Sequence, residues 1–382
     1  MLAMLASIGL VRYAYSPLVP SMIGHDWISN AQVGYLGTVN FIGNVLGAVL
    51  CGWLSRRFSG GVVIRAALVL GLASVGLSAL DWGPWWLGGC RFFAGFTAAG
   101  GMILAPALAT QGVPAAHRGR IIGTVFAGAG LGVVLLSLTL PGIMGDRPEV
   151  GWLYAAGLTL VCLIIAWTGL KTRASARAGP VAAEASNPNR GRLVLLATAY
   201  LFAAAAIVPH SIYLAAYLHV VMDQPLSFSM SVYAVYGAGV LIGGPLLDGP
   251  LQRLIGRRAA LTLAMVLGLI AALMVTLTQS VWIAVASGAV LGVSQMGYAS
   301  LTTHRVLALA GPSGHIRWWG RLTVVFNTSM AGGAFAMGYL ISIGSTVAWG
   351  YLAGFWMAAG CFAISAVLNA MVTTPPGVDG RT

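Results

Sequence analysis

Arg12 is the residue of this sequence whose position most strongly indicates chemistry. It lies near the middle of an apolar run, 1–23, that is long enough to cross a hydrocarbon core of about 30 Å. A guanidinium at that depth costs about 2.5–3.5 kcal/mol or more to insert, so it should face a polar cavity or a partner. The alternatives are snorkelling to the headgroups and a bond to carbonyls freed by Pro17 and Pro20. At about 1.5 Å per residue, Arg12 lies too deep for easy snorkelling, so we expect it to face a cavity.

Carboxylates that could neutralise such an arginine are scarce. None of the 8 acidic residues lies in the middle of an apolar run, and buried carboxylates are what proton relays and cation pockets in membranes normally use. A second arginine, Arg91, lies about two turns into another apolar run. Two arginines without a carboxylate favour an anionic ligand, held by charge-assisted hydrogen bonds. For Arg91, a structural hydrogen-bond hub is an equal alternative.

Other polar side chains within the apolar runs could shape the same pocket. Asn40 and Asn44 are four residues apart and therefore share one face of a helix. Hydrogen bonds between helices are their alternative role. The predicted substrate-binding residues are Arg12, Tyr15, Asn40, Asn44, Arg91, Tyr213, Tyr236, Gln295 and Asn327.

His210 is the candidate for proton coupling. It follows Pro209 inside an apolar run, and its unperturbed pKa lies near physiological pH. The prediction depends on this one residue, and an ordinary buried histidine is the alternative.

The composition defines the elements that must position these residues. The chain has 382 residues, of which 58% are hydrophobic and 7% charged, whereas soluble domains carry about 25% charged residues. The runs are apolar all round rather than alternating, which predicts helices and argues against a β-barrel. The 4 cysteines lie in apolar runs without metal-ligand spacing, so we expect no metal site and no cofactor. No catalytic set is present, so we expect no enzyme.

Hydropathy predicts about twelve spans of roughly 20 residues. They are 1–23, 31–54, 61–80, 85–109, 120–143, 150–170, 193–220, 227–250, 259–278, 281–304, 320–342 and 346–371. The fold class is an all-α membrane protein with two pseudosymmetric six-helix halves. We expect an N-terminal half at 1–170, a cytoplasmic linker at 171–192 and a C-terminal half at 193–382.

The basic residues cluster in alternate loops, and the acidic residues lie mostly in the opposite ones. By the positive-inside rule the basic loops and both termini are cytoplasmic, in a bacterial inner membrane. This topology explains the net charge of +12, so we expect the bilayer and no nucleic acid as a partner.

Two loops resemble the signature loop of the major facilitator superfamily, in which Gly-x-Leu-x-Asp precedes a Gly-Arg-Arg turn. The predicted gating residues are Arg56 and Arg57 in the first copy and Asp248, Arg257 and Arg258 in the second. The first copy has Ser55 where the superfamily has Asp.

Two further segments carry the resemblance. The segment 91–95, Arg-Phe-Phe-Ala-Gly, is similar to that superfamily's fourth-span motif, and 12–22 resembles the opening of its YbfB/YjiJ-like branch. The resemblance implies the twelve-helix fold, transport by alternating access and a monomer.

The combined prediction is a secondary active transporter that moves a small organic anion, a carboxylate, across the membrane. The sequence leaves open whether protons move with this anion. The alternative is a broad exporter of amphipathic or neutral compounds, in which the arginines serve gating. A preference for hydrophobic cations would favour that alternative.

Overall fold

The computed structural model describes residues 1–111, 113–169 and 189–372. Twelve helical segments within these ranges are long and apolar enough to cross a membrane, which confirms the predicted spans and the all-helical fold class. The first six run over Leu2–Gly24, Asn30–Ser55, Gly60–Leu77, Pro84–Ala109, Ile121–Met144 and Pro148–Trp167. The last six run over Arg190–Val221, Leu226–Ile255, Arg257–Thr276, Val281–Gly311, Arg317–Ile343 and Val347–Met371.

Several spans are built from more than one helical element. The N-terminal half consists of α1 (Leu2–Met4), η1 (Leu5–Arg12), α2 (Tyr15–Gly24), α3 (Asn30–Arg57), α4 (Gly60–Leu77), α5 (Pro84–Ala109), α6 (Ala115–Met144) and α7 (Pro148–Gly169). The C-terminal half consists of α8 (Arg190–Val208), η2 (Pro209–Tyr213), α9 (Leu214–Ala216), η3 (Tyr217–Val221), α10 (Leu226–Leu246), η4 (Leu247–Leu251), α11 (Gln252–Ile255), α12 (Arg257–Thr276), α13 (Val281–Ile343) and α14 (Val347–Met371). The elements labelled η are π-helices, and α13 contains two spans separated by a break at Gly311.

The seventh span starts earlier than hydropathy predicts. α8 begins at Arg190, and Asn189 caps it by accepting a hydrogen bond from the N–H of Arg192 over 3.3 Å. The last residues of the predicted linker 171–192 are therefore helical, while 171–188 lie outside the described residues. The domain limits 1–170 and 193–382 stay a prediction.

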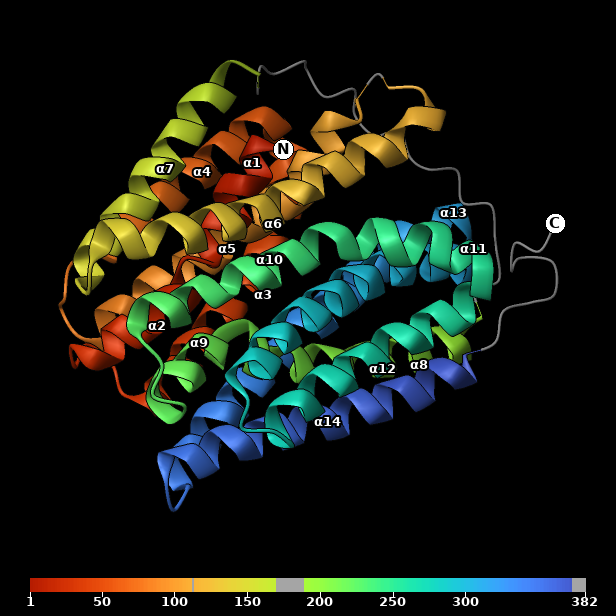
Figure 1. Cartoon of the computed structure of the whole chain (residues 1–382). Coiled ribbons are helices and arrows are strands. Elements are labelled where there is room, and N and C mark those ends of the chain that lie inside the picture. The colour runs from red at the N-terminus through yellow and green to blue at the C-terminus, as the bar shows by residue number, and fades with distance from the viewer. Residues whose placement is uncertain (112, 170–188, 373–382) are drawn as a thin grey trace.

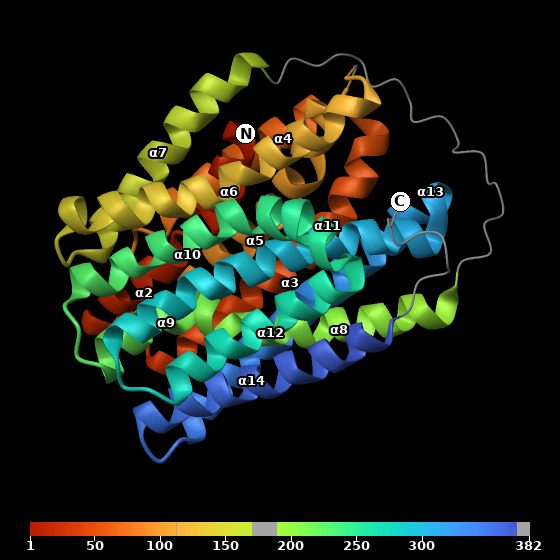
Figure 2. The same ribbon diagram turned by 45° about the vertical axis from the view of Figure 1, so that its right-hand side comes forward.

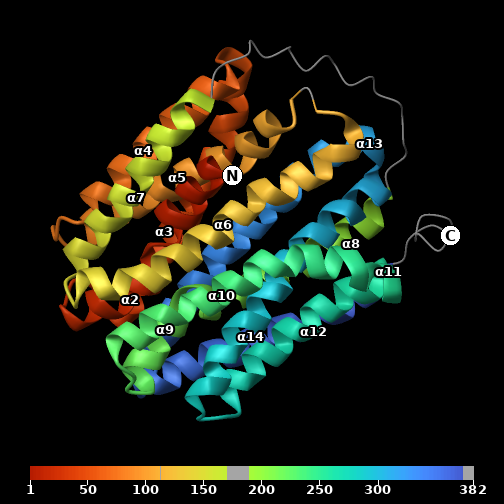
Figure 3. The same cartoon turned by 45° about the horizontal axis from the view of Figure 1, so that its top comes forward.

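The two halves lie side by side (Figure 1). The red-to-yellow N-terminal half packs along the green-to-blue C-terminal half, and the turned views keep this arrangement (Figures 2 and 3). α6 and α10 run next to each other in all three views, and Gly130 of α6 approaches Gly237 of α10 closely enough to exclude a side chain.

The two ends of the bundle differ in charge. Arg57, Arg253, Arg257 and Arg258 lie at one end, which we call the basic end. Asp26, Asp81, Asp146 and Asp223 lie in connections at the other end, which we call the acidic end.

Hydrogen bonds join the two halves on the acidic side of the middle of the bundle. Ser16 Oγ donates to the Ser211 carbonyl over 2.8 Å, and Thr38 Oγ1 donates to the Ala331 carbonyl over 3.1 Å. Nearer the acidic end, the Tyr351 hydroxyl donates to Asn30 Oδ1 over 2.8 Å. Ser16, Thr38, Ser211 and Tyr351 all lie in the halves of their spans that lead to the acidic end. The structure is therefore held closed between the central cavity and the acidic end.

Glycines allow the second and fourth spans to touch backbone to backbone. A Cβ on Gly43 of α3 would lie 2.1 Å from the Phe92 carbonyl oxygen of α5. In the opposite direction, a Cβ on Gly95 of α5 would lie 1.8 Å from the Asn40 carbonyl oxygen. Close approach through small residues is the usual basis of helix association in membranes.

The eighth and tenth spans repeat this contact in the other half. A Cβ on Gly239 of α10 would lie 2.3 Å from the Ala289 carbonyl oxygen of α13, and one on Gly292 would lie 2.3 Å from that of Tyr236. This repetition relates the two halves and places Asn40 and Tyr236 at corresponding positions. The two halves therefore have the same helix-to-helix backbone contact, but the side chain at this position is Asn40 in one half and Tyr236 in the other.

We expect Gly95→Ala to destabilise the protein because its methyl group has no space against the Asn40 carbonyl. Overpacking of this kind costs about 1–3 kcal/mol. Gly89→Ala is the matched control, since Gly89 lies on the same helix with nothing within 4 Å of an added Cβ. Thermal unfolding of both variants in detergent measures the difference. Equal unfolding temperatures would contradict the backbone contact.

Candidate functional site

A cavity of about 30 Å³ lies between the two halves at the level of Arg12. The first span contributes Arg12, Tyr13, Tyr15 and Ser16, and the second contributes Gly37, Asn40 and Phe41; Arg91, Ser211, Ile212 and Met330 complete the lining. The structure thus brings together four of the predicted substrate-binding residues, Arg12, Tyr15, Asn40 and Arg91. Because each half contributes residues, movement of the halves changes the shape of this cavity.

A change of helical geometry positions Arg12. The first span is a π-helix over Leu5–Arg12, and the N–H of Tyr13 donates to the Ile8 carbonyl over 3.1 Å. Pro17, four residues after Tyr13, lacks an N–H to continue the α-helical pattern. The N–H of Ser16 instead donates to the Tyr13 carbonyl over 3.3 Å. The irregular segment therefore places Arg12 and Tyr13 beside the cavity.

Arg12 is half-buried, and its charge is not neutralised by the protein. Its guanidinium carbon lies 4.9 Å from the ring centroid of Phe41, a cation–π contact. Within the residues that the structure describes, no hydrogen bond or ion pair from this guanidinium is found. Phe41 covers one side of the group, and the N–H donors at its edge remain available to an anion.

Arg91 bonds to the protein through both terminal nitrogens, while its buried Nε has no hydrogen-bond partner. Its side chain is 1% exposed, one terminal nitrogen donates to the Val11 carbonyl over 3.3 Å, and the other donates to Ser78 Oγ over 3.1 Å. Its guanidinium carbon lies 4.6 Å from the Trp152 ring centroid and 5.8 Å from that of Tyr15. Arg91 therefore braces the first, third, fourth and sixth spans, as expected of a hydrogen-bond hub, although it also borders the cavity.

The two asparagines bond to the neighbouring helix. Asn40 Nδ2 donates to the Arg91 carbonyl over 2.8 Å, and Asn44 Nδ2 donates to the Gly95 carbonyl over 3.2 Å. Both bonds join α3 to α5 beside the glycine contact. Asn40 also lines the cavity, whereas Asn44 lies one turn further toward the basic end.

Most of the predicted tyrosines have protein partners. The Tyr15 hydroxyl donates to the Val33 carbonyl over 3.0 Å, and the Tyr236 hydroxyl donates to Gln295 Oε1. The Tyr236 ring centroid lies 6.3 Å from that of Tyr13, which connects this pair to the cavity wall. Tyr213 is fully buried and packs edge-on against Tyr351, with ring centroids 5.7 Å apart.

Asn327 and His210 lie away from the described cavity lining. Asn327 is buried and donates from Nδ2 to the Thr323 carbonyl of its own helix over 2.9 Å. His210 is buried inside the C-terminal half, and its Nε2 lies 3.2 Å from Ser287 Oγ. Its ring packs edge-on against the ring of Phe355, with the two centroids 4.9 Å apart. The proton-coupling role of His210 stays a prediction.

The second signature loop forms a hydrogen-bonded cluster at the basic end. Asp248 Oδ2 accepts a hydrogen bond from Ser300 Oγ over 2.6 Å, and Oδ1 lies 3.0 Å from His304 Nδ1. Arg258 donates to the Ala370 carbonyl at the end of α14. These contacts join the end of the eighth span to the tenth span, and the start of the ninth span to the end of the twelfth.

The first signature loop has a different set of contacts. Arg57 lies over the Trp53 ring, 4.4 Å from its centroid, and Ser55 Oγ donates to the Cys51 carbonyl of its own helix over 2.7 Å. The side chain of Arg56 lies outside the described part of the chain. The gating function of both loops stays a prediction.

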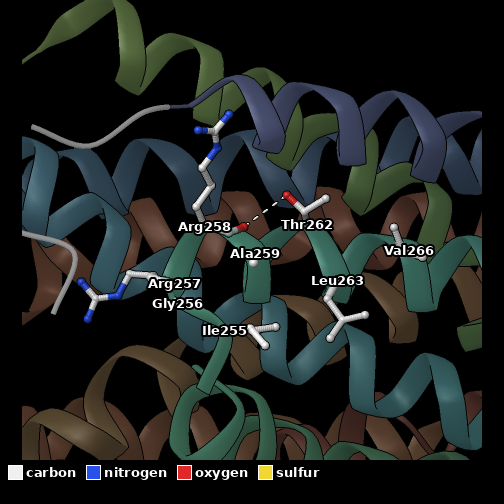
Figure 4. Close-up of a pocket in the computed structure, with 8 residues that line it drawn as sticks. All are labelled: Ile255, Gly256, Arg257, Arg258, Ala259, Thr262, Leu263 and Val266. Atoms are coloured by element: carbon white, nitrogen blue, oxygen red, sulfur yellow. Dashed lines mark hydrogen bonds between the residues drawn. The ribbon is translucent and has the colours of Figure 1, made fainter. Parts of the chain in front are cut away.

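A larger hollow lies on the flank of α12 at the basic end (Figure 4). Its volume is about 790 Å³, and its lining runs along one stretch of chain, from Ile255 to Val266. Arg257 and Arg258 point in different directions, and Thr262 donates to the Arg258 carbonyl over 3.2 Å. Because its charged groups do not converge, this open groove is a weaker candidate site than the central cavity.

Sequence reasoning missed Tyr13, Phe41, Ser16 and Ser211 as cavity residues. Tyr13 directly follows the predicted Arg12, and Phe41 directly follows the predicted Asn40. Aromatic and small hydroxyl side chains are common in membrane spans, so only their position beside the charge distinguishes them.

The fold and cavity define a multi-pass membrane protein with the architecture of a transporter. A family model described as "Uncharacterised MFS-type transporter YbfB" matches residues 4–370, and the chain belongs to this family of the major facilitator superfamily. The predicted superfamily and branch are therefore confirmed. The family is one of membrane transporters and not of enzymes.

Curated relatives match part of the chain. The niacin transporter NiaP of Acinetobacter baylyi is 29% identical over 145 residues, which are 38% of this chain and 31% of that protein. The gentisate transporter of Corynebacterium glutamicum is 27% identical over 149 residues, which are 38% of this chain and 33% of that protein. The chain thus matches about a third of the length of each relative.

A solved structure matches nearly the whole fold. A bacterial homologue of the human lysosomal transporter Spinster superposes with a TM-score of 0.76 and covers 97% of this chain and 95% of its own. The sequence identity is 15%, so this similarity shows the fold alone.

We expect Arg91→Ala to lower the stability of the ligand-free protein more than Arg12→Ala does. Removing Arg91 takes away the hydrogen bonds to the Val11 carbonyl and to Ser78 Oγ and opens a void against Trp152, which should cost about 2–4 kcal/mol. Arg12→Ala breaks no hydrogen bond to a described residue. Thermal unfolding of both variants without ligand tests this difference. An equal loss of stability would contradict the distinction between the two arginines.

Proposed function

We propose that this protein transports small organic anions, with Arg12 binding a carboxylate in the cavity between the halves. The single observation that carries the proposal is the Arg12 guanidinium, which lies against Phe41 with no described acceptor at its edge. A cation held in a largely apolar bundle is stabilised by an anion, and the planar guanidinium matches the geometry of a carboxylate.

The names of two relatives support the same class of substrate. Niacin and gentisate are both small aromatic carboxylates, and proteins named as their transporters match this chain over similar lengths. The described spans also lack a carboxylate facing Arg12, which a pocket for cations normally requires.

The transport cycle in this proposal is alternating access. We place the basic end and both termini in the cytoplasm of a bacterial cell, according to the positive-inside rule. The hydrogen bonds Ser16–Ser211, Thr38–Ala331 and Asn30–Tyr351 then close the extracellular side. Opening that side requires these bonds to break while contacts form nearer the basic end.

The other predicted residues have supporting roles in this proposal. Tyr15, Asn40 and Arg91 form walls of the cavity, and Tyr236 with Gln295 extends its aromatic side. Asn44 joins α3 to α5, Tyr213 packs against Tyr351, and Asn327 bonds within its own helix. We also propose that protons couple to transport at His210 and that the protein is a monomer. The carboxylate site depends on neither proposal.

We expect carboxylates to raise the unfolding temperature of the purified protein, and Arg12→Ala to abolish this effect. A ligand that binds only the folded state stabilises it by RT ln(1 + c/Kd), where c is the free ligand concentration, so the stabilisation grows with the logarithm of ligand concentration above the Kd. Arg12→Lys should bind more weakly than the native protein, since lysine keeps the charge and loses the bidentate geometry.

Arg253→Ala is the matched control, because it removes an exposed arginine at the basic end. It should keep the native response to carboxylates. Uptake by reconstituted vesicles provides the second readout. Full carboxylate binding and uptake by Arg12→Ala would overturn the proposal, and stabilisation by lipophilic cations alone would favour a broad exporter.

A further inference from the structure

Aromatic rings from both halves lie near Arg12. Phe41 from the second span lies against the guanidinium at 4.9 Å. Tyr13, the next residue after Arg12, is half-buried and packs against Tyr236 of the eighth span with ring centroids 6.3 Å apart. These rings come from both halves of the transporter, so a ligand in contact with all of them bridges the halves.

Most other polar side chains of the cavity wall already bond to the protein. Ser16 Oγ donates to the Ser211 carbonyl, Asn40 Nδ2 donates to the Arg91 carbonyl, and the Tyr15 hydroxyl donates to the Val33 carbonyl. Arg91 is bonded on both terminal nitrogens. Beside Arg12, the buried Nε–H of Arg91 is the donor of these residues that lacks a partner, whereas a polyol or a dicarboxylate requires a full second set of donors.

The remaining surface is apolar and partly adaptable. Ile212 and Met330 complete the lining, and methionine is the side chain that adjusts most easily to a ligand. The cavity of about 30 Å³ has room for water and not for a ring, so binding requires side chains or the halves to move apart. Such a change is expected of a site that opens and closes between two bundles.

From this arrangement we propose that the ligand is a planar aromatic monocarboxylate. Its carboxylate accepts hydrogen bonds from the edge of Arg12, and its ring packs against Phe41, Tyr13 and Tyr236. The inference rests on the proposed anion transport and specifies its substrate class. Offset or edge-to-face packing between rings strengthens binding by about twofold to tenfold beyond the burial of apolar area.

Gln295 acts as a positioning residue in this site. Its Oε1 accepts the hydrogen bond of the Tyr236 hydroxyl, which orients the ring that packs against Tyr13. The contact lies in the C-terminal half, whereas the charge lies in the N-terminal half. The C-terminal half therefore adds one ring to the charge and the two rings, Tyr13 and Phe41, of the N-terminal half.

Benzoate and cyclohexanecarboxylate test the inference because they have the same charge and the same number of carbon atoms. Isothermal titration calorimetry on the full chain in detergent measures both affinities. We expect benzoate to bind the native protein about twofold to tenfold more tightly. Phe41→Leu and Tyr13→Leu should bring the ratio of the two affinities toward one, while Phe41→Tyr should keep it.

The outcomes separate this inference from the proposed function. Equal affinities in the native protein, or binding of aliphatic carboxylates alone, would overturn the aromatic assignment and leave anion transport standing. Absence of binding by every carboxylate would overturn both. The comparison of benzoate with cyclohexanecarboxylate in the native protein does not depend on the folding of any variant. A Phe41→Leu protein that has the native unfolding temperature and keeps the full preference for benzoate would also overturn the assignment.

Discussion

The central constraint on this structure is the cost of a guanidinium inside an apolar helical bundle. Two such groups lie near the centre of the bundle, and the protein stabilises them differently. The Val11 carbonyl, Ser78 and two aromatic rings stabilise the charge of Arg91, and these contacts hold four spans together. Among the described residues, Arg12 has the face of Phe41 as its partner. The proposed selectivity for an anion rests on this difference between the two arginines.

Irregular backbone makes this division feasible. The π-helical turns that end at Arg12 alter the hydrogen-bond pattern of the first span, and the Val11 carbonyl is then available to Arg91. The glycine contacts bring the second and fourth spans close enough for Asn40 to reach the Arg91 carbonyl. Local geometry and close helix packing together hold one arginine in place and leave its neighbour free.

The two halves share a backbone contact and differ in chemistry. Asn40 and Tyr236 lie at corresponding positions of the glycine contacts, but the N-terminal side adds the charge and the C-terminal side adds a ring. The hydrogen bonds that close the acidic side are few, and such bonds contribute only about 0.6 kcal/mol each on average within membranes. A ligand that bridges the halves can therefore shift the balance between their arrangements with modest binding energy.

Hydropathy and charge distribution alone determined the twelve spans, because the energy of placing a segment in a membrane depends on its own side chains. The signature loops and 91–95 similarly indicated the superfamily, and the lone charge of Arg12 indicated a cavity. Sequence could not distinguish the roles of Arg12 and Arg91, since both are single arginines in apolar runs. Nor did it identify Tyr13 and Phe41 as neighbours of the charge. Only the tertiary structure decided these points, because hydrogen-bond partners and ring contacts depend on which distant helices meet and on which carbonyls an irregular turn exposes.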